Sequence, residues 1–154
     1  MHRYCVKMKV GYQFSLFTEQ THGGRSRRTH NRERYVSNQK YASAVRNATF
    51  TGDDNTKAPG NRGVKVTLDV TAVPGTDTVQ LVIEEKDAVS GKYVQVLAAV
   101  ARVATGTDQI VVYPGVTETA NVDTSNVLPD IYRVRVLHSA GSNFTYSIGV
   151  VELP

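Results

Sequence analysis

The sequence contains no tryptophan and a single cysteine, Cys5. One cysteine cannot form a disulfide within the chain, so packing and hydrogen bonds alone must hold the fold. Without tryptophan the chain lacks the best platform for stacking against a sugar ring, although its eight tyrosines leave that role open. The two absences argue against a disulfide-rich scaffold and weaken the case for a glycan-binding or host-surface-binding module.

Long apolar runs are also missing. Residues 96–101 form one of the longest, far short of the roughly 20 apolar residues that a membrane-spanning helix needs. Lys7 and Lys9 interrupt the segment after the basic N-terminus, and no small-residue cleavage site follows. We therefore expect no transmembrane segment, no signal peptide and no membrane partner. A length of 154 residues with 40% hydrophobic residues is typical of one globular domain.

Residues with catalytic or metal-binding chemistry are present, but their spacing does not fit a site. Ser90, Gly91 and Lys92 resemble the end of a phosphate-binding loop, but Lys86 and Tyr93 stand where that loop needs glycine and serine or threonine. The acid pairs at 53–54 and 84–85 are interpreted as solvated surface charges. None of the four histidines has metal-ligand spacing with another or with Cys5: His2, His22, His30 and His138. We expect no enzyme, cofactor, metal or small-molecule substrate.

Alternating apolar and polar residues dominate the chain from Gly63 onward. Period-two alternation is typical of half-buried strands, and turn-forming residues separate the segments. Residues 93–103 are apolar on both faces, which predicts a strand in the centre of a sheet. The expected strands cover residues 64–72, 79–84, 93–103, 109–113, 132–136 and 144–150. The prediction is an all-β fold, an antiparallel β-sandwich or barrel of about six to seven short strands over residues 63–154.

The first part of the chain has a different character. Residues 1–47 hold ten Lys or Arg against two acids, a net charge of +8, whereas the remainder holds eight against twelve, a net charge of −4. We interpret residues 1–47 as a basic N-terminal arm and the turn-rich residues 48–62 as a linker. Residues 35–45 are predicted to form a short helix. A basic arm on an acidic body favours binding to another copy or to an acidic partner surface.

Residues 4–17 within this arm alternate regularly. The alternation predicts a strand that pairs within its own chain or adds to the sheet edge of a neighbour; an extension that never folds is the third alternative. The apolar positions are Val6, Met8, Val10, Tyr12, Phe14 and Leu16.

An arginine-rich patch follows, and it is the candidate partner-binding site of the arm. Its residues are Arg25, Arg27, Arg28, Arg32, Arg34 and Tyr35. Arginine forms forked, charge-assisted hydrogen bonds with phosphates and carboxylates. We rank contact with a protein first, a solvated tail second and contact with nucleic acid third.

Several segments of residues 48–153 resemble a family of small proteins encoded in the structural-gene clusters of tailed bacteriophages and prophages. The segments that carry the resemblance are residues 62–72, 86–93, 112–115, 128–134 and 144–149. They are mostly strand and turn signatures and carry over no site residues. The first 45 or so residues fall outside the resemblance.

The resemblance implies a part of the virion, and within that class a capsid decoration or cement protein. Such a protein binds and bridges major capsid subunits in many copies and stabilises the head. The implied partners are the major capsid protein and further copies of the chain as a homo-oligomer, dimer or trimer. The implied location is the phage head surface, after assembly in the host cytoplasm. The alternatives are a neck or tail component and a nucleic-acid-binding protein acting through the arginine-rich arm.

Overall fold

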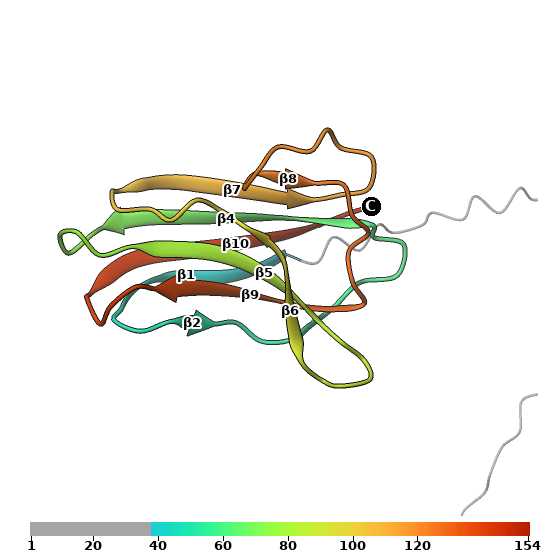
Figure 1. The fold of residues 1–154 in the computed structure, drawn as a ribbon, viewed down its shortest axis with the longest axis horizontal. Coiled ribbons are helices and arrows are strands. Elements are labelled where there is room, and N and C mark those ends of the chain that lie inside the picture. The colour runs from blue at the N-terminus through green and yellow to red at the C-terminus, as the bar shows by residue number, and fades with distance from the viewer. Residues whose placement is uncertain (1–37) are drawn as a thin grey trace, which may run out of the picture. The chain divides into compact units, whose positions relative to one another are not determined.

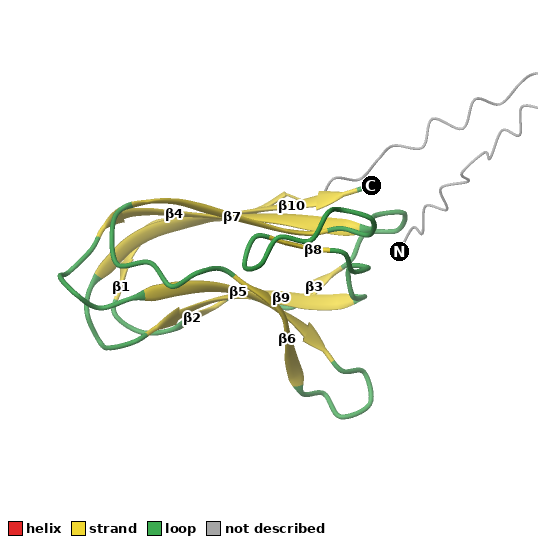
Figure 2. Cartoon of the chain, turned by 45° about the horizontal axis from the view of Figure 1, so that its top comes forward, coloured by secondary structure: helices red, strands yellow, loops and turns green. Residues whose placement is uncertain are grey.

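The computed structural model describes residues 38–154, which form a sandwich of two β-sheets without a helix (Figures 1 and 2). Residues 1–37, including the predicted strand at 4–17 and the arginine-rich patch, lie outside the described residues. The all-β prediction is confirmed: the ten strands form two mostly antiparallel sheets. Three of the ten are two residues long, which accounts for most of the excess over the expected number.

The first sheet, called sheet A, contains the longest strands. Its order is β1 (Asn38–Arg46), β10 (Phe144–Leu153), β4 (Gly63–Ala72), β7 (Gly106–Val112) and β8 (Asp123–Thr124). All neighbours are antiparallel except β7 and β8, which pair in parallel. The C-terminal strand β10 therefore lies inside the sheet, between β1 and β4.

The second sheet, called sheet B, faces sheet A. Its order is β2 (Phe50–Thr51), β9 (Ile131–His138), β5 (Val79–Lys86) and β6 (Tyr93–Ala98), and β3 (Asn55–Thr56) also pairs with β9. Strand β6 bonds to β5 alone, so it forms one edge of sheet B. The linker predicted at 48–62 thus contributes the two short strands β2 and β3.

The core lies between the sheets and consists of alternate residues of the long strands, as period two requires. Sheet A contributes residues from β4, β7 and β10, and sheet B contributes residues from β5 and β9. Fully buried examples are Val64, Val66, Leu68, Ile110, Phe144, Ile148, Leu81, Ile83, Val134 and Val136. The predicted alternation is therefore the alternation between core and surface.

One buried side chain near the end of β10 is a carboxylate. Glu152 is 1% exposed and accepts hydrogen bonds from the Ala58 N–H (2.9 Å), Asn61 Nδ2 (2.7 Å) and Tyr132 Oη (2.9 Å). Buried charges are tolerated when hydrogen bonds replace the lost water. Glu152 therefore joins the segment before β4 to sheets A and B.

Two sequence predictions about individual segments are wrong. The helix predicted at 35–45 is contradicted over 38–45, where the chain forms β1 along β10, because tertiary pairing overrides weak local propensity. The segment at 93–103 is not a central strand: β6 is an edge, and its valines stay partly in solvent. In this segment, apolar residues on both faces therefore belong to an edge strand and not to a central strand.

Candidate protein-binding surface

The described residues offer little that would suit a small ligand. Within residues 38–154, no three His, Cys, Asp or Glu side chains lie close enough together to hold a metal ion. A hollow of about 210 Å³ is lined by residues 100–104 and Asp108, below the roughly 300–1,000 Å³ of typical ligand pockets. Arg102 and Asp108, the charged residues of this hollow, bond to each other, with 2.6 Å between Arg102 Nε and Asp108 Oδ2.

The same described part of the chain contains no helix with the length and apolar character of a membrane crossing. The arm residues proposed as a site from sequence, Arg25 to Arg34 with Tyr35, lie in residues 1–37, so the structure neither brings them together nor separates them.

The hairpin of β5 and β6 projects from the body of the sandwich (Figure 2). Its turn is ordered by Asp87, whose carboxylate accepts the N–H groups of Val89 (3.3 Å) and Ser90 (2.9 Å). Gly91 has a φ of 67°, a left-handed conformation that glycine adopts without strain. The turn-forming residues expected between the predicted strands at 79–84 and 93–103 thus form a hydrogen-bonded turn at the tip of the hairpin.

Exposed valines gather on this hairpin and on the segment that follows it. Of the seven large hydrophobic side chains that are exposed within the described residues, four lie in residues 89–103: Val89, Val94, Val100 and Val103. Val89 at the tip is 95% exposed and Val94 in β6 is 57% exposed. These valines are spread along the edge of sheet B, because Val89 lies in the turn after Lys86, whereas Val103 follows Arg102, which bonds to Val79 at the other end of β5. Exposed apolar residues along an open strand edge mark a candidate interaction surface. We call residues 89–103 the valine edge.

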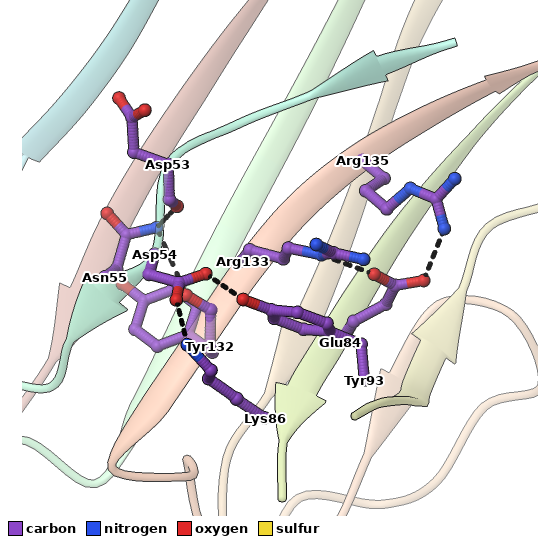
Figure 3. Close-up of polar contacts among 9 residues, drawn as sticks. All are labelled: Asp53, Asp54, Asn55, Glu84, Lys86, Tyr93, Tyr132, Arg133 and Arg135. Atoms are coloured by element: carbon purple, nitrogen blue, oxygen red, sulfur yellow. Dashed lines mark hydrogen bonds and ion pairs between the residues drawn. The ribbon is translucent and has the colours of Figure 1, made fainter. Parts of the chain in front are cut away.

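A polar network fixes the base of the hairpin on the outer face of sheet B (Figure 3). Glu84 of β5, 8% exposed, accepts hydrogen bonds from Arg133 Nε (2.7 Å) and Arg135 Nη1 (2.8 Å) of β9. The register pairs Glu84 directly with Arg133, and opposite charges across two strands stabilise that pairing. Glu84 is therefore not the solvated surface charge expected from the sequence.

The network continues to β6 and to the loop before β3. The Arg133 guanidinium carbon lies 3.3 Å from the centre of the Tyr93 ring, a cation–π contact. Tyr93 Oη donates to Asp54 at 2.5 Å, and Lys86 Nζ lies 2.8 Å from the same carboxylate. Hydrogen bonds from Lys86 and Tyr93 lower the pKa of Asp54. Four segments are thus joined on one face by contacts that include Tyr93, the first residue of β6 (Figure 3).

Sequence reasoning missed this network, although part of its signal was present. Arg133 and Arg135 occupy the polar positions of one predicted strand, and Glu84 occupies a polar position of another. Opposite charges on the outward faces of two strands suggest that the strands are neighbours. The contact of Tyr93 with Arg133 could not have been found this way, because it depends on β6 lying beside β5.

Replacing Glu84 tests what the network contributes. We expect Glu84→Gln to lower the free energy of unfolding by about 2 kcal/mol at neutral pH, because two half-buried guanidinium groups lose their carboxylate. Urea denaturation measures this. Glu85→Gln is the matched control: Glu85 is the exposed next residue, and we expect a change below about 0.5 kcal/mol.

The effect of Glu84→Gln should depend on pH. Burial raises the pKa of Glu84, but hydrogen bonds from Arg135 and Arg133 outweigh it and hold the pKa below its ordinary value of 4.5. A lowered folded pKa adds stability that is present above the unfolded pKa and is lost as pH falls through the folded one. The difference between wild type and Glu84→Gln should therefore shrink in acid. A difference that stays constant down to about pH 3 would contradict this.

The opposite edge of the domain, β1, is protected in a way that β6 is not. The pairing of β1 with β10 has a register shift between Tyr41 and Ala44. The Arg46 guanidinium donates hydrogen bonds to the carbonyl oxygens of Ala42 and Ala44, each at 3.2 Å. Bulges and charged side chains are common means of preventing edge strands from pairing with other chains. Strand β6 also has a register shift, between its pairs at Gln95 and Leu97, but it contains no charged residue and no proline.

Comparison with known proteins does not identify this chain. No model of a known protein family matches the sequence, and no curated protein matches it either.

Proposed function

We propose that this chain is a non-enzymatic structural protein of a phage virion, a capsid decoration protein that binds and bridges major capsid subunits on the head surface. The proposal unites two lines of argument. The strand and turn segments of residues 48–153 resemble proteins from phage structural-gene clusters, as described above. The described residues carry exposed valines along the β5–β6 edge, which supports contact with another protein, and the hollow at residues 100–104 is small for a ligand.

The observation that carries the proposal is the valine edge on its braced hairpin. A rigid apolar projection loses little conformational entropy when it inserts between two subunits, and apolar burial then drives binding. The contacts that hold the hairpin against sheet B are the Glu84 ion pairs and the contacts of Tyr93 with Arg133 and Asp54. Weak contacts of this size become effective when many copies act together on one shell.

The division of charge supports the same proposal. Because β1 belongs to the sandwich, the charge divides at residue 38: residues 1–37 carry 8 − 2 = +6 and residues 38–154 carry 10 − 12 = −2, so the arm and the body are of opposite sign. Charge complementarity of this kind raises association rates and sets orientation more than it raises affinity. The basic arm would then reach an acidic surface of another subunit while the body covers a junction.

The test is the number of copies in purified particles of the encoding phage, measured by quantitative mass spectrometry against the major capsid protein. We expect a ratio near one to one, or a simple fraction of it. We expect Val89→Asp to reduce the ratio about tenfold or more, because a charge at the hairpin tip must be desolvated on binding. Val127→Asp is the control, since Val127 is also exposed (56%) but lies outside residues 89–103.

The outcomes separate the alternatives. A handful of copies per particle would contradict decoration and favour a neck or tail component. Absence from the particle would contradict a structural role in the virion altogether. Equal incorporation of Val89→Asp and wild type would show that the hairpin tip is not the contact.

A further inference from the structure

The outer side of β6 has backbone groups without a partner among the described residues. The Asp87 N–H donates to the Lys92 carbonyl and the Ala99 N–H donates to the Leu81 carbonyl, each at 2.8 Å. In an antiparallel pair, residues alternate between bonding to the neighbour and facing away from it. Counted from the Lys92 carbonyl, Val94 bonds to β5, whereas Tyr93 and Gln95 direct their N–H and carbonyl groups away from it, toward an open edge. The register shift that follows Gln95 reverses this alternation before Ala99.

A further strand hydrogen-bonded to the edge of β6 could also cover apolar surface on the core side of sheet B. Ile83 of β5 belongs to the core, and Glu85, two residues further along β5, points to the same side of the sheet. Val94 of β6 pairs with Glu85, so the Val94 side chain also points to the core side. It is nevertheless 57% exposed, because no strand of the described residues continues the sheet there. A strand with one apolar face would cover Val94 and extend the core.

The sequence of the chain itself offers a segment that fits. In a strand, the strict alternation of residues 4–17 would place six apolar side chains on one face, with Lys7 and Lys9 on the other. The connecting residues 18–37 number 20 and can span up to about 66 Å when extended. This length is enough to reach another molecule. The basic charge of the arm and the acidic charge of the body favour the approach of one copy's arm to another copy's body.

We propose that residues 4–17 of one copy add to sheet B of a neighbouring copy as a strand beside β6. Main-chain hydrogen bonds to Tyr93 and Gln95 supply affinity, and the apolar face of the added strand covers Val94. The contact is head-to-tail, so successive copies close into a ring or extend as a chain. The inference deepens the proposed function by naming one partner of the valine edge, a second copy of this chain.

Two variants of the full chain test separately the donor, which is the added strand of residues 4–17, and the acceptor, which is the edge strand β6. Gln95→Pro blocks the acceptor edge, because it removes an outward N–H without removing a bond to β5. Val10→Asp combined with Tyr12→Asp destroys the apolar face of the donor. We expect wild type to associate in sedimentation velocity and each variant to associate about tenfold or more weakly. An equimolar mixture of the two variants should form a one-to-one heterodimer, because each supplies what the other lacks.

A second variant of β6 tests whether Gln95→Pro weakens association only because the variant misfolds. Val94→Lys should weaken association as Gln95→Pro does, whereas Val127→Lys should not, although the two valines are equally exposed (57% and 56%). Circular dichroism confirms that each variant is folded.

Three results would overturn the proposal. Wild type that stays monomeric excludes exchange between copies. A donor variant that associates like wild type points to symmetric pairing of two β6 edges. A mixture that forms no heterodimer shows that the two elements do not meet between copies. None of these measurements uses virions, so this inference and the decoration role can fail separately.

Discussion

A chain that begins at residue 48 should be unfolded or severely destabilised relative to a chain that begins at residue 38. The difference is β1, which pairs with β10 over Asn38–Arg46. Without it β10 becomes an edge strand. We expect the free energy of unfolding to fall by about 3 kcal/mol or more, the scale of removing one large buried aromatic side chain.

Particular contacts of β1 account for this expectation. The Tyr41 ring lies 4.9 Å from the Phe50 ring and packs against the core, and Tyr41 Oη accepts the Asp53 N–H at 3.2 Å. A Cβ on Gly52 would lie 2.5 Å from Tyr41 Oη, so the loop is shaped around this tyrosine. The Arg46 guanidinium lies 4.6 Å from the Tyr146 ring centre. All of these contacts are lost together when residues 38–47 are removed.

Urea denaturation of the two truncated chains and the full chain measures the effect. The chain that begins at 38 serves as the control, because it removes the whole segment before β1 and leaves every contact named above. Equal midpoints for the chains that begin at 38 and at 48 would show that β1 contributes nothing to the stability of the sandwich.

Glu152→Ala should be the most destabilising single substitution of a polar residue, lowering the free energy of unfolding by about 4 kcal/mol. The substitution leaves the Ala58 N–H, the Asn61 amide and the Tyr132 hydroxyl without their shared acceptor, and each lost bond of this kind costs roughly 1–3 kcal/mol. The substitution also removes the free-energy cost of burying a carboxylate, which offsets part of this loss of stability. Burial, followed by the Glu152 carboxylate, raises the pKa of Tyr132, so this phenol stays protonated and donates.

Graded variants give this prediction its controls. Glu152→Gln keeps the size and one acceptor oxygen and should lose about half as much stability. Tyr132→Phe removes a single bond and should cost about 1–2 kcal/mol. Glu85→Ala, on the exposed end of β5, should be near neutral. Thermal or urea unfolding ranks the four, and a Glu152→Ala variant as stable as Glu85→Ala would refute the role of the buried carboxylate.

The long strands were the part of the fold most open to prediction. Residues 64–72, 132–136 and 144–150 alternate so regularly that their faces could be assigned, and the assignments agree with the observed burial except at Ala72, which is exposed. Turn chemistry was equally informative at Asp87 and Gly91. The prediction failed for β1, whose residues form a strand through pairing with the distant β10.

The candidate surface was much less predictable than the strands. The valines of residues 89–103 look like core residues in the sequence, and their exposure follows from the place of β6 at the end of sheet B. Glu84 looks like a surface charge, and its burial follows from the two arginines that the register brings to it. Both errors concern contacts between segments far apart in the chain.

By itself, the amino-acid sequence determined the all-β class, the long strands, their inward faces and the charge difference between the arm and the body. Each of these follows from local properties: alternation, turn residues and composition act over a few neighbours. Only the tertiary structure decided which strands are neighbours, which edge stays open and which charges meet. Strand order depends on hydrogen bonds between distant segments, and alternation along one strand says that a face is buried but not what covers it.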